Sequence, residues 1–139
     1  MKKVFITGGT GTVGSSFIKN YYGEYKFYSY SRNEKLQVAL KRRFPDIEII
    51  LGGIEDAYAL TMAITSVKPD IVIHTAALKH VDTAEKQPTH AVSTNIIGSY
   101  NVVKACQKAD VPITIGISTD KACLPYCVYG YTKLIMEKI

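Results

Sequence analysis

The chain has 139 residues, 47% of them hydrophobic and 21% charged, and this size and composition predict one globular domain with its own core. Its formal net charge of +5 comes from scattered basic residues without a nucleic-acid-binding motif, so we expect an anionic small-molecule partner and no nucleic acid. With no bilayer-length apolar run, no signal-type segment and an odd number of cysteines, three, we expect a cytoplasmic protein with reduced thiols and no membrane partner.

Short apolar runs alternate with amphipathic segments along the chain. We predict strands at 2–8, 26–31, 47–51, 70–76 and 113–118. We predict helices at 12–22, 33–44 and 56–67, a long helix that begins near Pro88, and a last helix of about three turns from Tyr129. Strands that alternate with helices form right-handed βαβ units, so we expect an α/β protein with a doubly wound, Rossmann-like parallel sheet of strand order 3-2-1-4-5.

Three glycines lie directly between the first strand and the first helix, in "TGGTGTVG". Gly8 would allow the tight turn, Gly11 the close approach of a pyrophosphate, and Gly14 the packing of the helix on the strand. The anion would lie on the positive N-terminus of the helix. The spacing is G-x-x-G-x-x-G, and in this strand–turn–helix context it favours a dinucleotide site over a purely structural turn.

The end of the second strand indicates which dinucleotide binds. An acidic residue there would bind the 2′-hydroxyl of NAD, but the chain has "YSRNEK" with Ser31, Arg32 and Lys35. A hydroxyl and a guanidinium suit a 2′-phosphate, so we predict NADP. The alternative is that Arg32 is a solvated loop residue.

Tyr129 and Lys133 are one helical turn apart and share a face of the last helix. A nearby ammonium stabilises a phenolate, so Tyr129 could take a hydroxyl proton while hydride leaves the same carbon for a nicotinamide. In a chain with ten tyrosines, ordinary aromatic packing is the alternative interpretation.

Asp120 and Lys121 follow the fifth strand at its C-terminal end, where open α/β sheets bind ligands. Asp120 could protonate a leaving hydroxyl, and Lys121 could remove a carbon-bound proton. A salt bridge within a loop is the alternative.

Several motifs occur together in one order across nearly the whole chain: "TGGTGTVG", "SRNEK", "HTAALKHVDTAEKQP", "TNIIGSYNV", "STDKA" and "YGYTK". In this combination the chain resembles the nucleotide-sugar 4,6-dehydratases that act on UDP-N-acetylglucosamine, in the polysaccharide-biosynthesis group of the extended short-chain dehydrogenase/reductase superfamily. Relatives that act on dTDP-glucose carry Asp-Glu in place of Asp120-Lys121.

The resemblance implies a three-step reaction. Tyr129, helped by Lys133, would deprotonate the C4 hydroxyl as hydride passes to NADP⁺. Lys121 would then remove the C5 proton and Asp120 would help to expel the C6 hydroxyl, before hydride returns to C6. The implied substrate contacts are Lys79, Ser118 and Thr119. The implied cofactor contacts, besides Tyr129 and Lys133, are Gly8, Thr10, Gly11, Thr12, Val13, Gly14, Ser31, Arg32, Asn33, Lys35, Ile54, Thr75, Ala76 and Lys79.

The chain departs from the family pattern at three points. The family has Gly-Asp after the third strand, with the Asp on adenine, where this chain has Gly52-Gly53. The family's Asn-Pro is Leu124-Pro125 here, and Cys127 stands where Asn is common. We therefore expect changes in adenine binding and in the loop beside the site. Cys123 and Cys127 lack a second ligand pair, so we expect no metal site, and we expect His74 to be a core residue.

The resemblance further implies a C-terminal part of comparable size that binds uridine and sugar, whereas we expect residues 1–139 to form the NADP-binding domain alone. Two hypotheses stay open: half of a dehydratase that is active only when the remainder is supplied, and an NADP-binding fragment or split-gene product without turnover. A nucleotide-sugar epimerase or reductase is the alternative chemistry. Lys121 argues against an epimerase, because epimerisation at C4 needs no base at C5. In this superfamily the helices that correspond to residues 88–109 and to the segment after Tyr129 pair across a two-fold axis. We therefore expect a homo-oligomer through apolar faces that include Ile96, Val103, Leu134 and Ile135.

Overall fold

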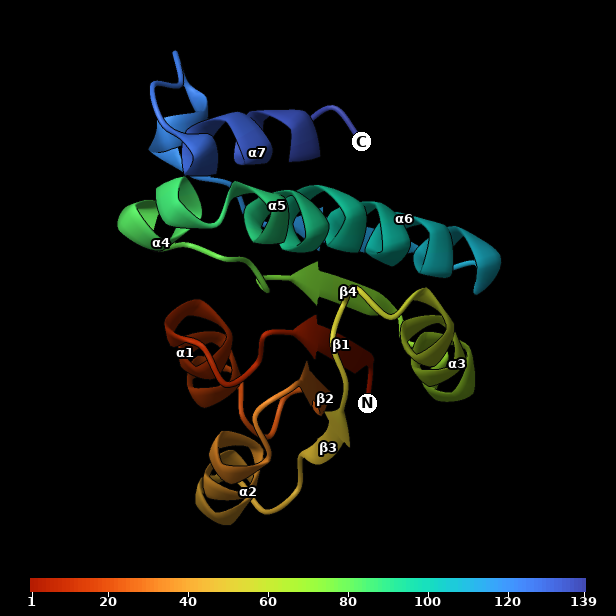
Figure 1. The fold of residues 1–139 in the computed structure, drawn as a ribbon. Coiled ribbons are helices and arrows are strands. Elements are labelled where there is room, and N and C mark those ends of the chain that lie inside the picture. Colours follow the sequence, from red (N-terminus) through yellow and green to blue (C-terminus); the bar gives the residue numbers. More distant parts are fainter.

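The computed structural model describes residues 1–139 and contains one five-stranded parallel sheet with the order β3-β2-β1-β4-β5 (Figure 1). The strands are β1 Lys3–Thr7, β2 Lys26–Ser31, β3 Glu48–Leu51, β4 Ile71–His74 and β5 Ile113–Gly116. The predicted fold class and strand order are confirmed. Because all strands run in parallel, their carboxyl ends meet at one edge, where a Rossmann-like sheet binds ligands.

Helices cover both faces of the sheet, as a doubly wound fold requires (Figure 1). The main helices are α1 Thr12–Asn20, α2 Glu34–Arg43, α3 Ala57–Val67, α6 Ser99–Lys108 and α7 Val128–Met136. Side chains of β1 alternate between two cores: Val4 and Ile6 pack with Ile18 of α1 and Leu40 of α2, and Phe5 packs in the core that contains residues of α3 and α6. Period-two alternation therefore fills two separate apolar layers.

The helical run after β4 is more complex than the single long helix predicted from Pro88. A short helix, α4 Val81–Lys86, precedes it, and the run itself consists of α5 Pro88–Ala91, the π-helical segment η1 Val92–Gly98, and α6. Pro88 lies in the first turn of α5, where its missing N–H costs nothing. A Cβ on Gly98 would lie 2.6 Å from the Ile54 side chain, so the π segment approaches the loop after β3 closely.

The predicted helix at 12–22 ends earlier, at Asn20, and only some of its apolar side chains face the core. Ile18 is fully buried, but Val13 and Tyr21 are 51% and 40% exposed. Gly14 is buried at the point where α1 approaches the preceding turn.

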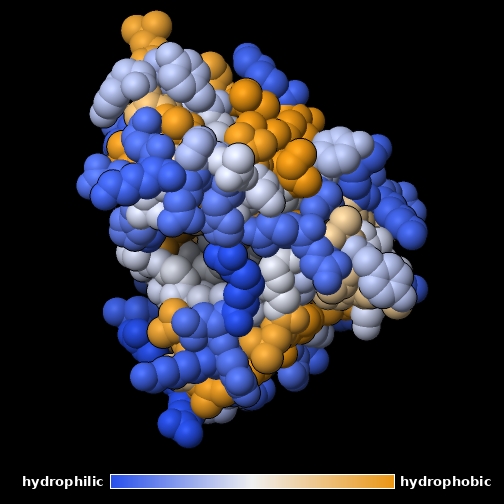
Figure 2. Space-filling view, in the orientation of Figure 1, coloured by the Kyte–Doolittle hydropathy of each residue, from blue (hydrophilic) through white to orange (hydrophobic).

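Some apolar side chains remain on the surface. All four residues of β5 are exposed, and Figure 2 shows hydrophobic side chains gathered over the α5–α6 run, where Val92 and Ile97 are exposed. None of the helices combines the length and the hydropathy that crossing a membrane would take.

Candidate active site

A cavity of about 210 Å³ opens at the carboxyl edge of the sheet, beside the glycine turn. Its walls come from the β1–α1 turn, the ends of β2 and β3, and the segment after β4. It brings together ten of the predicted cofactor residues: Gly8, Gly11, Thr12, Val13, Ser31, Arg32, Ile54, Thr75, Ala76 and Lys79.

The glycine turn has the local geometry that a pyrophosphate requires. Gly8 has a φ of +75°, and a Cβ there would lie 2.8 Å from the Ala76 nitrogen. A Cβ on Gly14 would lie 2.6 Å from the Gly8 carbonyl oxygen, so the third glycine allows α1 to pack against the turn. No side chain caps the N-terminus of α1, which leaves its first N–H groups available to an anion.

Four predicted cofactor residues lie near the cavity without lining it. Thr10 forms a 2.9 Å hydroxyl–hydroxyl hydrogen bond with Ser31, and Gly14 faces the turn. The Asn33 side chain accepts a hydrogen bond from the Leu36 nitrogen at 3.0 Å and so caps α2, and Lys35 is exposed on that helix.

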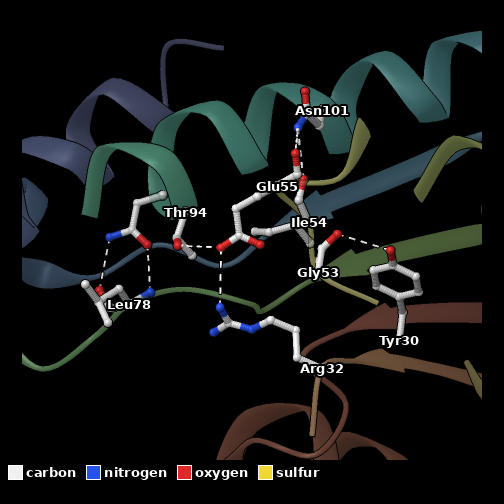
Figure 3. A network of polar contacts seen from close by, with 9 residues as sticks. Tyr30, Arg32, Gly53, Ile54, Glu55, Leu78, Thr94 and Asn101 are labelled. Carbon is white, nitrogen blue, oxygen red and sulfur yellow. Dashed lines mark hydrogen bonds and ion pairs between the residues drawn. The ribbon is translucent and has the colours of Figure 1, made fainter. Parts of the chain in front are cut away.

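A polar network that the sequence patterns do not predict lies along the wall of the cavity, and Figure 3 shows its contacts. Thr94 donates a hydrogen bond to Oε1 of Glu55 at 2.6 Å, and a guanidinium nitrogen of Arg32 lies 3.6 Å from the same oxygen. Asn101 donates to the Ile54 carbonyl at 3.0 Å, which ties this loop to α6. Arg32, the predicted 2′-phosphate residue, is thus paired with a carboxylate.

Lys133 is buried on α7, and its ammonium points away from solvent. It donates to the Ile117 carbonyl at 2.6 Å and contacts the Met136 sulfur at 3.0 Å, without a hydrogen bond to Tyr129. Burial lowers the pKa of Lys133 from 10.5 to about 8, against an opposing effect of Glu137. Lys133 therefore remains a cation at neutral pH.

Contacts from other elements fix the position of α7. Glu85 of α4 accepts a hydrogen bond from the Val128 nitrogen at 2.6 Å, and the Cys127 sulfur accepts one from the Gly130 nitrogen at 3.4 Å. Asn95 donates to the Thr132 hydroxyl and to the Leu78 carbonyl, both at 3.0 Å. Asn95 thereby joins the loop after β4 to the helix that carries Tyr129.

The predicted acid–base pair lies in a one-turn 3₁₀ helix, η2 Asp120–Ala122, that packs against α7. The Lys121 ammonium lies 3.7 Å from the Asp120 carboxylate. The Thr119 hydroxyl, which donates to Asp120 at 3.0 Å, and then the Lys121 charge hold the pKa of Asp120 below its usual value. A Cβ on Gly130 would overlap the Lys121 carbonyl oxygen, so this turn contacts α7 directly.

Other predicted residues have structural contacts. Ser118 donates a hydrogen bond to Glu137. His74 is buried, as predicted, with Nδ1 2.7 Å from the Thr7 hydroxyl and Nε2 2.9 Å from the Ser99 hydroxyl. Because Ser99 donates its own proton to the Asn95 carbonyl, it accepts from Nε2–H, and Nδ1 accepts from Thr7.

The sequence matches the family described as polysaccharide biosynthesis protein over residues 4–139. The chain belongs to this family. It is 41% identical over 143 residues to the UDP-N-acetylglucosamine 4,6-dehydratase (inverting) of Campylobacter jejuni, and the match covers 99% of this chain and 42% of that protein. It is also 34% identical over 148 residues to the UDP-glucose 4-epimerase of Rickettsia canadensis, with 99% and 42% covered.

Solved structures support the same relationship. Pen from Bacillus thuringiensis superposes with a TM-score of 0.93 at 37% identity, over 99% of this chain and 43% of that one. The Bordetella bronchiseptica enzyme WbmG in complex with NAD gives a TM-score of 0.82 at 27% identity, over 99% and 48%. The chain thus spans less than half the length of these polysaccharide biosynthesis relatives and structural neighbours.

Within this family, a nucleotide cofactor of the Rossmann type fits the cavity. The fit rests on the Gly8 turn, where no side chain could be accommodated, and on the uncapped N-terminus of α1. Asn95 lies in one of the motifs that carry the resemblance, "TNIIGSYNV", but no periodicity in the sequence indicated its contact with Thr132.

Proposed function

We propose that this chain is the cofactor-binding portion of an NADP-dependent nucleotide-sugar 4,6-dehydratase that acts on UDP-N-acetylglucosamine. The observation that carries the proposal is the contact of the Lys121 carbonyl with Gly130, which fixes the Asp120–Lys121 pair beside the first turn of α7. In this proposal Lys121 is the base for C5 and the Tyr129 hydroxyl acts at C4, both following β5 in the chain. The similarity to the Campylobacter jejuni dehydratase supports this assignment.

The cofactor is proposed to extend from the glycine turn across the end of β2. The N–H groups at the start of α1 would hold its pyrophosphate, and Ser31 and Arg32 would hold a 2′-phosphate. When bound, NADP⁺ would supply a hydride acceptor for C4 oxidation. The choice of NADP over NAD rests on Ser31 and Arg32 and on the lack of an acidic residue at the end of β2.

Lys133 is proposed to supply the positive charge that lets Tyr129 act as a base. Its pKa of about 8 keeps it protonated at pH 7, and burial would strengthen its field at a neighbouring phenolate. In this structure the Lys133 ammonium donates its hydrogen bond to the Ile117 carbonyl. We therefore expect the Lys133 side chain to turn toward Tyr129 when the cofactor binds.

Asp120 and Lys121 are proposed to act after a proton passes from the ammonium to the carboxylate. The two groups form an ion pair 3.7 Å apart, in which the Thr119 hydroxyl and then the Lys121 charge hold the pKa of Asp120 low. Neither group can then do its predicted work, since an acid needs its proton and a base must lack one. A sugar that covers the pair would exclude water and favour the neutral form, with the proton on Asp120 and Lys121 free to act as base.

A 4-epimerase is the second candidate, because the Rickettsia canadensis relative carries that name. The two are separated by supplying the part of the Campylobacter jejuni dehydratase that lies beyond the matched region as a second polypeptide, with UDP-N-acetylglucosamine and NADP⁺. Dehydration removes one water from the product mass, and Lys121→Ala should abolish that loss. An epimer of unchanged mass would contradict the dehydratase, and dinucleotide binding without turnover would favour a binding module.

The three free thiols and the exposed helical run support a cytoplasmic, self-associating protein.

A further inference from the structure

The cavity is lined by an acidic side chain, Glu55, two residues after the Gly53 position that carries no side chain. The loop after β3 lines the same cavity as the glycine turn and the end of β2, so a dinucleotide with its pyrophosphate at the turn and its ribose at β2 would place its base near this loop. Gly52, Gly53, Ile54 and Glu55 of this loop line the cavity together with Arg32. Gly53 offers no side chain to the base.

The Glu55 carboxylate fills the space beside Gly53. A Cβ on Gly53 would lie 2.8 Å from Oε2 of Glu55, so this oxygen occupies the position toward which a side chain at residue 53 would point. Both contacts of the carboxylate, from Thr94 at 2.6 Å and Arg32 at 3.6 Å, are made to Oε1 (Figure 3). Oε2 therefore keeps its acceptor capacity, on a side chain that is only 25% exposed.

The backbone beneath Glu55 is also fixed. Asn101 donates to the Ile54 carbonyl at 3.0 Å and to the Glu55 carbonyl at 3.3 Å, and Ile54 itself is buried against Gly98. A carboxylate oriented by Thr94 and carried on a pinned loop is a preorganised acceptor.

We propose that Glu55 recognises the adenine base of the cofactor, with Oε2 accepting a hydrogen bond from the exocyclic amino group of adenine. Because Oε1 also holds Arg32, the same carboxylate orients the guanidinium at the 2′-phosphate side, so one residue serves both ends of the adenosine. The inference rests on the proposed function, namely that the cavity binds NADP.

The test compares NADP⁺ with its hypoxanthine analogue, in which an oxygen replaces the amino group. That oxygen can only accept, so it would face the Glu55 carboxylate without a proton between them. Calorimetric titration of the 139-residue chain should give about tenfold tighter binding of the adenine form. Glu55→Ala should bring the two affinities within about twofold, and Glu55→Gln, whose amide can also donate, should do so as well. Glu48→Ala, an acid of β3 outside the cavity, should keep the preference.

Moving the acid gives a second, independent measurement. Gly53→Asp with Glu55→Ala should restore the adenine preference, because removal of Glu55 clears the space for the new side chain. Gly53→Asp alone should weaken both dinucleotides, since two carboxylates would crowd one position. Unchanged preference in Glu55→Ala, or equal affinities in the unaltered chain, would overturn the inference while leaving NADP binding intact. Failure of the unaltered chain to bind either dinucleotide would instead overturn the proposed function.

Discussion

The ammonium of Lys133 donates a hydrogen bond to the carbonyl oxygen of Ile117 at 2.6 Å, so a buried cation ties α7 to the segment that leaves β5. The helix that carries Tyr129 is thereby held against the sheet by the same side chain that the proposed chemistry requires. The charge is in a position where water cannot reach it, which is why burial lowers the pKa of Lys133 to about 8.

Lys133→Met should raise the unfolding free energy at pH 7 by on the order of 2 kcal/mol, because the desolvation cost of the buried ammonium outweighs the hydrogen bond that it donates to the Ile117 carbonyl. The folded-state pKa of about 8 lies below the usual 10.5, so the unfolded chain binds the extra proton between these values. Stability contributed by this residue therefore rises with pH across that window, and the difference between variant and wild type should shrink. Urea unfolding at pH 7, 8.5 and 10 measures it. The exposed Lys138→Met is the control, and equal stabilities at pH 7 would contradict the prediction.

His74 should make the fold sensitive to mild acid. Burial, and then the charge of Lys133, lower the pKa of His74 from 6.5 to about 4. Between these values the unfolded chain binds the additional proton. The unfolding free energy therefore keeps the full contribution of neutral His74 above pH 6.5 and decreases toward pH 4, by up to roughly 3 kcal/mol. His74→Gln keeps a donor and an acceptor but does not titrate, and should flatten this part of the curve. The exposed His90→Gln should not, and the same slope in all three proteins would rule out His74 as the cause.

Arg32→Ala should weaken NADP⁺ binding by roughly 10- to 150-fold, the range for loss of a charge-assisted hydrogen bond, and change NAD⁺ binding far less. The side chain of Arg32 is 61% exposed, and one of its guanidinium nitrogens lies 3.6 Å from Oε1 of Glu55. Glu55 therefore orients the guanidinium, which stays accessible to a ligand. Titration with both dinucleotides gives the ratio, and Arg42→Ala, an exposed cation of α2, is the matched control. Tighter binding of NAD⁺ than NADP⁺ by the unaltered chain would refute the cofactor assignment.

The strand order could be predicted because alternation of strand and helix, with right-handed crossovers, leaves few topologies open. The glycine turn could be predicted because its residue spacing is local. The partners of Glu55 and Asn95 could not, since Thr94 and Thr132 are 39 and 37 positions away and polar side chains carry no periodicity that pairs them. The close approach of Gly98 in the π segment to Ile54 likewise depends on tertiary packing, which a sequence pattern does not show.

Leu124→Asn should raise the unfolding free energy by about 0.5–1 kcal/mol. Leu124 has a φ of +49°, which is a left-handed backbone conformation, and its side chain is 95% exposed. The strain of this conformation is therefore not offset by side-chain packing. Asn adopts this conformation more readily than Leu. Thermal unfolding compares the two, and Tyr126→Asn, at an exposed neighbour of ordinary φ, is the control. A gain as large at Tyr126 would show that surface polarity, and not backbone strain, is responsible.

Self-association should depend on the helical run over η1 and α6. Ile97 of η1 is 48% exposed and Ile135 of α7 is 46% exposed, and Figure 2 shows hydrophobic side chains gathered over the α5–α6 run. Burying such side chains against a second copy would remove apolar area from water, at roughly 25 cal/mol per Å². Sedimentation velocity at tens of micromolar should therefore show dimers or larger species. Ile97→Glu should shift the population to monomer, because it would place two like charges at an isologous contact. Met62→Glu, at a 53% exposed position of α3, should leave it unchanged. A clean monomer in the unaltered chain would contradict the predicted homo-oligomer, and equal effects of the two substitutions would place the contact elsewhere.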